Sequence, residues 1–355
     1  MDFQVFQRQT TERGVVRVTG RVAYESEALE ARLTGPSLEG DWMGQWESLR
    51  PDVEGDGFSG DIKAPAGGWY RLEVRAKNAG KVIGDVAIEH VGIGEVFVGA
   101  GQSNSTNYGS EPQRSSTGMV ASFSGKLWQV ANDPQPGTQD NSTGGSFWPA
   151  LGDALAEKYH VPIGVAVTGC GSTSVREWLP KGVRFKQPPT TGRHVKPAPD
   201  GGWESTGQLF EGLIRRVAQL GPNGFRAILW HQGESDAGQA RGGHPDSQIT
   251  GDQYREFMQK LIEASREKAG WKMPWFVAEA TYHSEQDPSD DEFRAAQKSL
   301  WGTGVALPGP DTDALGAEYR KGVHFNAKGL QAHGKAWAEK VSAYLDKALS
   351  EEKAP

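Results

Sequence analysis

From residue 92 onward, short apolar runs alternate with longer stretches in which apolar residues recur at helical spacing. The runs lie at 96–98, 161–167, 227–230 and 274–280. Each run is short and lacks alternating polar residues, which is typical of a strand buried on both faces. Strands that alternate with helices predict an α/β fold, in which helices cover both faces of a parallel sheet.

The first 91 residues follow a different pattern, with apolar residues at every second position. Val16 and Val18 share one parity, as do Leu29, Ala31 and Leu33. Turn-rich segments such as KAPAGG separate these runs, and this combination predicts a small antiparallel β-sandwich. We therefore expect two domains, a β-sandwich over residues 1–91 and an α/β domain over residues 92–355. The proline- and glycine-rich segment 181–203 is expected to form a long loop.

The charge and cysteine content exclude several partners. A formal net charge of −7 without a basic cluster argues against nucleic-acid binding. No run approaches the roughly 20 apolar residues of a membrane helix. The single cysteine, Cys170, excludes an intrachain disulfide and a multi-cysteine metal site. The N-terminal residues do not resemble a signal peptide. Localisation stays open, including a secreted or periplasmic protein whose signal is absent from this chain, and so does the oligomeric state.

Four polar clusters stand where the predicted sheet would place a site. They are GQSNS at 101–105, TGCGSTS at 168–174, HQGESD at 231–236 and GVHFN at 322–326. The first three follow predicted strands, and parallel sheets bind ligands at the carboxyl ends of their strands. The fourth precedes the last predicted helix.

Together the four clusters supply every part of a serine hydrolase site. Ser103 is the candidate nucleophile and His324 the candidate base. Backbone N–H groups of Ser103 and Gly171 and the Gln232 amide are candidate oxyanion donors. Glu234 is the candidate acid behind His324. Each cluster alone also fits ordinary turn or helix-cap chemistry, but four clusters in order at one sheet edge favour catalysis.

These motifs resemble the SGNH hydrolases, and most of all their carbohydrate-esterase branch, which contains sialate O-acetylesterases and acetylxylan esterases. The resemblance covers roughly residues 92–345. It implies a flavodoxin-like three-layer α/β/α core without metal or organic cofactor. It also implies a serine esterase that removes O-acetyl groups from a carbohydrate, such as xylan or sialic acid, through an acetyl-serine intermediate. Members of the branch often carry an extra β-sandwich, which suits residues 1–91.

The chain departs from the family pattern at the position of the acid that would partner His324. Family members commonly have an acid three residues before the histidine, where this chain has Lys321. A lysine cannot accept a hydrogen bond from the imidazole. In the subset with the HQGE motif the acid is thought to be the glutamate of that motif, which transfers to Glu234. Asp236, Asp313 and Glu318 are the alternatives, as is a serine–histidine dyad without an acid.

Four further residues are candidate substrate contacts: Asn104, Arg176, Trp178 and His231. Three of them have a simpler explanation, because tryptophans are more often core residues, a histidine at a strand end is as often structural, and Arg176 could be a surface charge. No His-Glu-x-x-His motif occurs and the histidines are scattered, so no metal site is predicted. Cys170 is expected to be a packing residue.

Two other functions remain open from the sequence. One is a carbohydrate-binding protein with impaired catalysis, which Lys321 favours. The other is a short-chain lipase or thioesterase on the same scaffold. The polar, glycine-rich loops disfavour long acyl chains, and the complete set of Ser103, Gly171, Gln232 and His324 disfavours a loss of catalysis.

Overall fold

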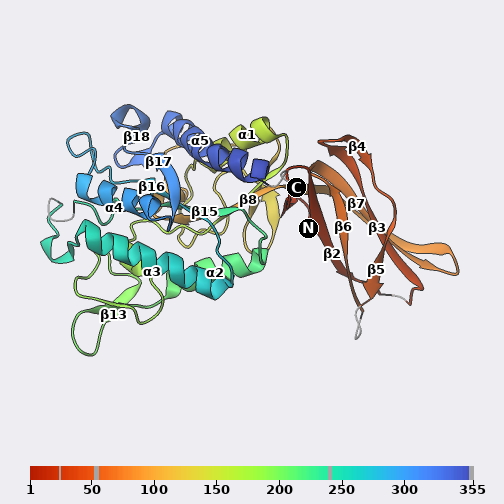
Figure 1. Cartoon of the computed structure of the whole chain (residues 1–355), viewed down its shortest axis with the longest axis horizontal. Helices are drawn as coiled ribbons and strands as arrows, with labels where there is room; N and C mark the ends of the chain where they lie inside the picture. The colour runs from red at the N-terminus through yellow and green to blue at the C-terminus, as the bar shows by residue number, and fades with distance from the viewer. Residues whose placement is uncertain (24, 52–55, 239–241, 352–355) are drawn as a thin grey trace.

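One long strand, β8 (Lys81–Gly101), runs through both halves of the protein (Figure 1). In the computed structural model, which describes residues 1–23, 25–51, 56–238 and 242–351, the first part of β8 pairs antiparallel with β7 (Gly67–Asn78). Its last part pairs in parallel with β11 (Ile163–Val167) and β15 (Ala227–His231). The same strand therefore begins in an antiparallel flank and ends in the centre of a parallel sheet.

The N-terminal flank consists of antiparallel strands, as the period-two pattern predicts. Its strands besides β7 and β8 are β2 (Arg13–Arg21), β3 (Ala28–Ser37), β4 (Gly40–Met43), β5 (Glu47–Pro51) and β6 (Gly57–Pro65). Val16 and Val18 on β2 are buried, as are Leu29, Ala31 and Leu33 on β3. These side chains share one apolar core, so the antiparallel strands predicted before residue 92 are confirmed.

The expected domain boundary at 91/92 lies inside β8. Val91 pairs with Gln4 of β1 (Gln4–Gln7), which runs parallel to β8, and with Tyr70 of β7. Just after β1, Arg8 forms a fully buried ion pair with Glu95 at 2.6 Å. The N-terminal strand is thus anchored on the portion of β8 that enters the parallel sheet, and a division into two domains stays a prediction.

The second half contains the expected parallel sheet. Its order is β10 (Trp128–Val130), β9 (Val120–Phe123), β11, β8, β15, β16 (Trp275–Glu279) and β17 (Leu307–Asp311). All neighbours pair in parallel except β10 with β9. The protein is therefore an α/β protein with a mixed sheet, and this class is as predicted. Counted along the chain, β11-β8-β15-β16-β17 follow the order 2-1-3-4-5.

Helices cover both faces of this sheet (Figure 1). On one face lie α1 (Trp148–Tyr159) and α5 (Ala327–Glu351), and on the other α2 (Gln208–Leu220), α3 (Gly251–Ala269) and α4 (Asp291–Gly302). Alternate residues of β8, β11, β15 and β16 belong to two separate cores, for example Phe97 with Trp337 and Val98 with Leu213. The continuous apolar runs in the sequence are explained by this burial on both faces. Within the described ranges, no helix is long and apolar enough to span a membrane.

The segment 181–203, expected to be a loop, is more ordered than predicted. It includes β12 (Arg184–Phe185) and β13 (Val195–Pro197), which pair antiparallel with β14 (Trp203–Ser205). These strands are only two or three residues long, so they leave no periodic pattern in the sequence.

Candidate active site

The end of β8 is the point from which the sheet is built in both directions. Strand β11 lies on one side of β8 and β15 on the other, which makes this end a topological switch point. Gly101, with φ of +125°, ends the strand against β15. A Cβ at Gly101 would lie 2.0 Å from the carbonyl oxygen of His231, and the next residue, Gln102, donates its N–H to that same oxygen at 2.9 Å. Glycine therefore lets the two strand ends meet.

Ser103 begins a 3₁₀ turn, η1 (Ser103–Ser105), directly after this strand end. Its side chain is largely buried but lines a pocket. The turn is held by hydrogen bonds to its own carbonyls, from Ser105 Oγ to Gln102 O at 2.7 Å and from Thr106 Oγ1 to Ser103 O at 3.0 Å. Trp148 Nε1 donates to Ser105 O at 3.0 Å. The serine is thus presented on a fixed turn.

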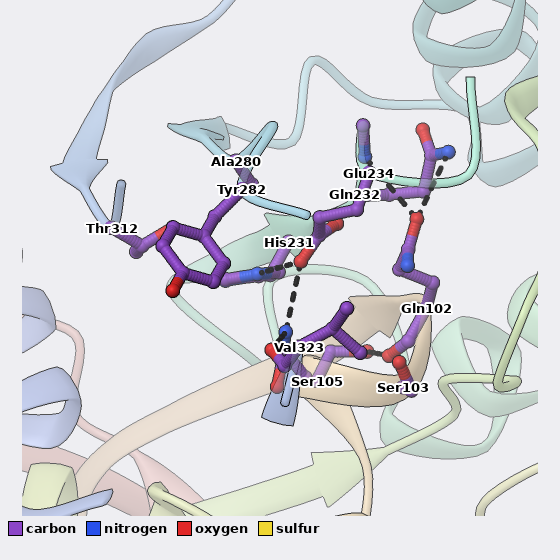
Figure 2. Close-up of polar contacts among 12 residues, drawn as sticks. Gln102, Ser103, Ser105, His231, Gln232, Glu234, Ala280, Tyr282, Thr312 and Val323 are labelled. Atoms are coloured by element: carbon purple, nitrogen blue, oxygen red, sulfur yellow. Dashed lines mark hydrogen bonds and ion pairs between the residues drawn. The ribbon is translucent and has the colours of Figure 1, made fainter. Parts of the chain in front are cut away.

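The side chain of Gln102 joins this turn to the HQGESD cluster, as Figure 2 shows. Its Oε1 accepts hydrogen bonds from Ser235 N at 3.0 Å and from Gly233 N and Gln232 Nε2, both at 3.4 Å. The sequence places Gln102 in the first cluster without indicating a role for it. In the structure it sets the distance between the turn that carries Ser103 and the loop that carries Glu234.

Glu234 is a buried carboxylate with two unequal oxygens. Oε1 accepts from His231 Nε2 at 2.9 Å (Figure 2). It also accepts from Asn104 Nδ2 at 2.9 Å. Oε2 is buried and has no hydrogen-bond partner among the described residues. Burial by itself raises the pKa of Glu234, but the charge of His231 and the hydrogen bonds from His231 and Asn104 bring that pKa down to about 2. Glu234 is therefore ionised at neutral pH.

His324 enters the site on a short hairpin formed by β18 (Arg320–Lys321) and β19 (His324–Phe325). Burial lowers the pKa of His324, the carboxylate of Glu234 opposes that shift, and the guanidinium of Arg320 adds to it. The ring lies 5.1 Å from that of Tyr108, centroid to centroid. No hydrogen bond among the described residues joins His324 to Ser103 or Glu234, but all three residues line the same pocket. Catalytic hydrogen bonds are often open in unliganded enzymes.

The other candidate acids have partners elsewhere. Asp236 is buried against Arg176, Asp313 accepts from Thr281 and pairs with Arg294, and Glu318 is exposed and pairs with Lys328. Of these carboxylates and Glu234, it is Glu234 that acts on the pKa of His324. Lys321 is exposed and lies opposite His324 in the hairpin.

Two of the three expected oxyanion donors are already engaged. The N–H of Gly171 donates to Asp140 Oδ2 at 2.6 Å. The Gln232 amide nitrogen lies 2.7 Å from Asp236 Oδ2, 3.1 Å from Thr173 O and 3.4 Å from Gln102 Oε1, so its two hydrogens already have three acceptors within the protein. The geometry therefore does not support Gly171 or Gln232 as oxyanion donors, and the N–H of Ser103 stays a prediction.

Three of the four expected substrate contacts are buried away from the pocket. The guanidinium of Arg176 donates to Ser174 Oγ, Gln187 O and Ser247 O and pairs with Asp236. The side chain of Trp178 is fully buried, with its Nε1 bonded to Thr173 Oγ1 at 2.9 Å. His231 is also fully buried.

None of these three side chains lines the pocket, so the geometry does not support them as substrate contacts. Their sequence neighbours lie at the end of predicted strands, but the side chains themselves turn inward. The fourth expected contact, Asn104, does line the pocket. Its amide donates to Glu234 and to Val323 O at 3.2 Å.

The pocket has a volume of about 370 Å³ and is lined mostly by residues of polar type. The polar lining residues that the sequence did not single out as site residues are Gln102, Ser172, Ser174, Glu177, Thr190, Thr191, Ser235, His244 and His283. Ser172 and Ser174 belong to the second polar cluster, and that cluster is the sequence signal that could have identified them as pocket residues. Thr190 and Thr191 lie in the segment expected to be a loop, where no pattern points to them.

Neither a metal site nor a reactive thiol is found in the part of the chain that the structure describes. No group of three or more histidine, cysteine, aspartate or glutamate side chains there is placed to hold a metal ion. Burial raises the pKa of Cys170 to about 12, so its thiol stays protonated and unreactive at neutral pH.

Residues 93–343 match a family model described as carbohydrate esterase, sialic acid-specific acetylesterase. No curated protein matches the chain. Among solved structures, the chain is similar to XAC1771, a carbohydrate acetylesterase from Xanthomonas citri, with 17% identity and a TM-score of 0.54 over 95% of this chain and 72% of that one. This likeness shows a shared fold. A protein from Arabidopsis thaliana matches with 18% identity and a TM-score of 0.49 over 71% of this chain and 98% of that one.

Proposed function

The chain belongs to the carbohydrate esterase family of sialic acid-specific acetylesterases, and we propose that it removes O-acetyl groups from a carbohydrate through an acetyl-Ser103 intermediate. Members of this SGNH-type family are carboxylic ester hydrolases, and the chain is one of them. One observation carries the proposal: Ser103, Glu234 and His324 line one pocket at the switch point of the sheet. The strand order 2-1-3-4-5 and the helices on both faces support a flavodoxin-like α/β/α core.

In the proposed reaction, His324 takes the proton of the Ser103 hydroxyl as Oγ attacks the acetyl carbonyl. The tetrahedral intermediate breaks down when the sugar oxygen leaves with the proton from His324. Water, deprotonated by His324, then attacks the acetyl ester of Ser103, and acetate leaves as Oγ regains a proton. The backbone N–H of Ser103 is the proposed oxyanion donor. The imidazole must come within hydrogen-bond distance of Oγ in the substrate complex.

Glu234 supports this mechanism electrostatically. Its carboxylate is ionised and raises the pKa of His324, so it stabilises the imidazolium that forms when Ser103 loses its proton. The buried Oε2 has no hydrogen-bond partner among the described residues, so it is available to the imidazole N–H.

The charge of the pocket favours a neutral sugar as the substrate. The described lining residues include the carboxylates of Glu177 and Glu234 and the hydroxyls of Ser172, Ser174 and Thr191, but no lysine or arginine. Sugar hydroxyls can donate to these oxygens, whereas the carboxylate of a sialic acid would meet like charge, with no lysine or arginine among the described lining residues to offset it. We therefore propose an acetylated neutral polysaccharide over an acetylated sialic acid.

The test is acetate release from acetylated xylan, acetylated xyloglucan and O-acetylated sialic acid, with Ser103→Ala as the control protein. The expected result is release from a neutral polysaccharide by the parent and a loss of at least about 10³-fold in Ser103→Ala. Faster release from sialic acid would overturn the substrate preference alone. Glycan binding without acetate release from any substrate, or retained activity in Ser103→Ala, would overturn the proposed reaction.

The acyl group is tested separately with p-nitrophenyl esters of increasing chain length. The pocket is small, and Val323 is the one aliphatic side chain among its described lining residues, so acetate is expected to be the preferred acyl group. Preference for butyrate and longer chains would favour a lipase or thioesterase.

A further inference from the structure

A chain of buried ring nitrogens connects helix α5 to Glu234. Trp337 Nε1 lies 3.0 Å from His333 Nε2, which lies 3.1 Å from His231 Nδ1. His231 Nε2 lies 2.9 Å from Glu234 Oε1. Trp337, His333 and His231 are fully buried, and 5% of Glu234 is exposed. This series of ring nitrogens therefore connects α5 to the Glu234 carboxylate through the protein interior.

The chemistry of these groups assigns the protons. An indole N–H can only donate, so His333 Nε2 accepts from Trp337. His333 Nε2 has a single lone pair, and His231 Nδ1 lies 3.1 Å from that nitrogen. Two nitrogens without hydrogens would repel at this distance, so His231 Nδ1 carries a hydrogen, and it shares the lone pair of His333 with the Trp337 N–H. His333 then carries its own hydrogen on Nδ1, which is buried and has no hydrogen-bond partner among the described residues. The other nitrogen of His231, Nε2, faces a carboxylate oxygen and must also share a proton with it. His231 is therefore the donor on both sides, which is the hydrogen-bond pattern of an imidazolium.

The surrounding charges are arranged around the Glu234 carboxylate. On the hairpin, the charge of Glu234 acts on the pKa of Arg320 (β18) and of His324 (β19). Burial, with a smaller contribution from the charge of Glu234, raises the pKa of Tyr254 on α3. Asn104 on η1 donates a neutral hydrogen bond to the same oxygen as His231. Burial and the charges of His231 and Arg320 hold the pKa of His333 well below its usual range, so His333 remains a neutral acceptor.

We propose that His231 is a positioning residue that holds Glu234 by a charged hydrogen bond at Oε1 and thereby keeps Oε2 free for His324. His333 and Trp337 enforce this state, since an acceptor at His231 Nδ1 requires that nitrogen to keep its hydrogen. The two oxygens of Glu234 thus have separate tasks. The inference rests on the proposed role of Glu234 in the esterase reaction.

Two substitutions at His231 separate the hydrogen bond from the charge. In His231→Gln the amide nitrogen can take the place of Nε2 and donate to Glu234 without a positive charge. In His231→Asn the amide can take the place of Nδ1 and reach His333 but not Glu234. Without the charge of His231 the pKa values of Glu234 and His324 rise, so the acid limb of the kcat profile should move to higher pH in both variants.

The variants should differ at the alkaline plateau of that profile. We expect His231→Gln to keep most of the parental kcat, and His231→Asn to lose roughly 10- to 100-fold, the effect of one hydrogen bond to a charged group. KM should change little, because His231 does not line the pocket. A purely structural role would lower the amount of folded protein without moving the pH profile. An unshifted acid limb in folded His231→Gln would overturn the proposal.

A second measurement does not depend on activity or on the variants folding. In parental protein labelled with ¹⁵N-histidine, the two ring nitrogens of His231 should both have the shifts of protonated nitrogen at neutral pH, and both nitrogens should carry slowly exchanging hydrogens. A His231 ring with one unprotonated nitrogen would overturn the proposal while leaving the esterase reaction intact. Retained activity in Ser103→Ala would instead overturn the reaction, whatever the spectrum of His231.

Discussion

Asn104 Nδ2 donates to Glu234 Oε1 at 2.9 Å, so the residue beside the proposed nucleophile holds the proposed acid. The same amide donates to Val323 O at 3.2 Å, next to His324 in the chain. One side chain therefore connects three of the four polar clusters. An asparagine suits this position because its side-chain amide supplies two N–H donors and carries no charge.

Asn104→Asp is expected to lower activity by removing both donors and adding a negative charge next to Glu234. Two carboxylates at hydrogen-bond distance cannot both ionise readily, so their apparent pKa values should separate and one should rise. The acid limb of kcat/KM should therefore move to higher pH, and kcat should fall by roughly 10-fold or more. Exposed Asn223→Asp, which makes the same charge change away from the pocket, is the matched control. An identical profile for the two variants would contradict the role given to Asn104.

The proposed mechanism predicts that activity rises with pH below the ordinary histidine range and is level at neutral pH. His324 must be neutral to accept the serine proton, and burial lowers its pKa from 6.5. Glu234→Gln removes the carboxylate that raises that pKa. The midpoint of the acid limb should therefore move to still lower pH, while the plateau kcat should fall by roughly 10- to 1,000-fold. These changes are measured as pH profiles of p-nitrophenyl acetate hydrolysis.

If Glu234→Gln has the parental plateau kcat and the parental midpoint pH, Glu234 is not the acid partner of His324. Either another carboxylate has that role, or His324 acts without one. Asp313→Asn is the comparison, because Asp313 was an alternative acid and is buried against Thr281 and Arg294. We expect that variant to lose stability without the shift to lower pH.

The α/β class could be predicted because burial on both faces leaves continuous apolar runs in the sequence, such as Ala227 to Trp230. Strand β17 has the sequence LPGPD and was missed, since it lies at the edge of the sheet and its prolines and glycine hide the strand pattern. The continuity of β8 across residue 91 was also missed. A change in periodicity shows where a strand acquires new neighbours, but it does not show that the strand ends there.

The sequence could place the candidate site residues near one another, but it could not show the direction of several of their side chains. Polar residues at strand ends predict a site, and Ser103, Glu234 and His324 line one pocket. His231 belongs to one of these clusters and Arg176 lies two residues after another, yet both side chains point into the protein, where they contact His333 and Asp236. Partners that are 60 and 102 residues away in the chain leave no local pattern, so inward and outward side chains look alike in the sequence.

Arg176→Met should destabilise the protein rather than weaken substrate binding. Arg176 and Asp236 are both fully buried, so removing the guanidinium leaves a buried negative charge unpaired, at a cost of about 3–5 kcal/mol in the free energy of unfolding. The double variant Arg176→Met with Asp236→Asn should recover part of that loss. KM of the remaining folded enzyme should stay near the parental value. A large rise in KM with parental stability would restore Arg176 as a substrate contact.

The control for this prediction is Arg184→Met. Arg184 pairs with Asp200 on the surface, where 53% and 62% of the two side chains are exposed. Exposed ion pairs contribute about 0–1 kcal/mol, so this variant should unfold almost like the parent. Urea unfolding of the variants gives the comparison directly.

Gly101→Ala tests whether the meeting of β8 and β15 positions the nucleophile. A Cβ there would lie 2.0 Å from the His231 carbonyl oxygen, and φ of +125° is strained for alanine. The backbone must shift to make room, which we expect to cost about 2–5 kcal/mol in the free energy of unfolding. Since Gln102 and Ser103 follow immediately, kcat should fall as well.

Gly302→Ala is the control, because a Cβ at that end of α4 meets no atom within 4 Å. Both the stability and the kcat of this variant should stay near parental. Parental stability and kcat in Gly101→Ala would show that this close contact does not position Ser103.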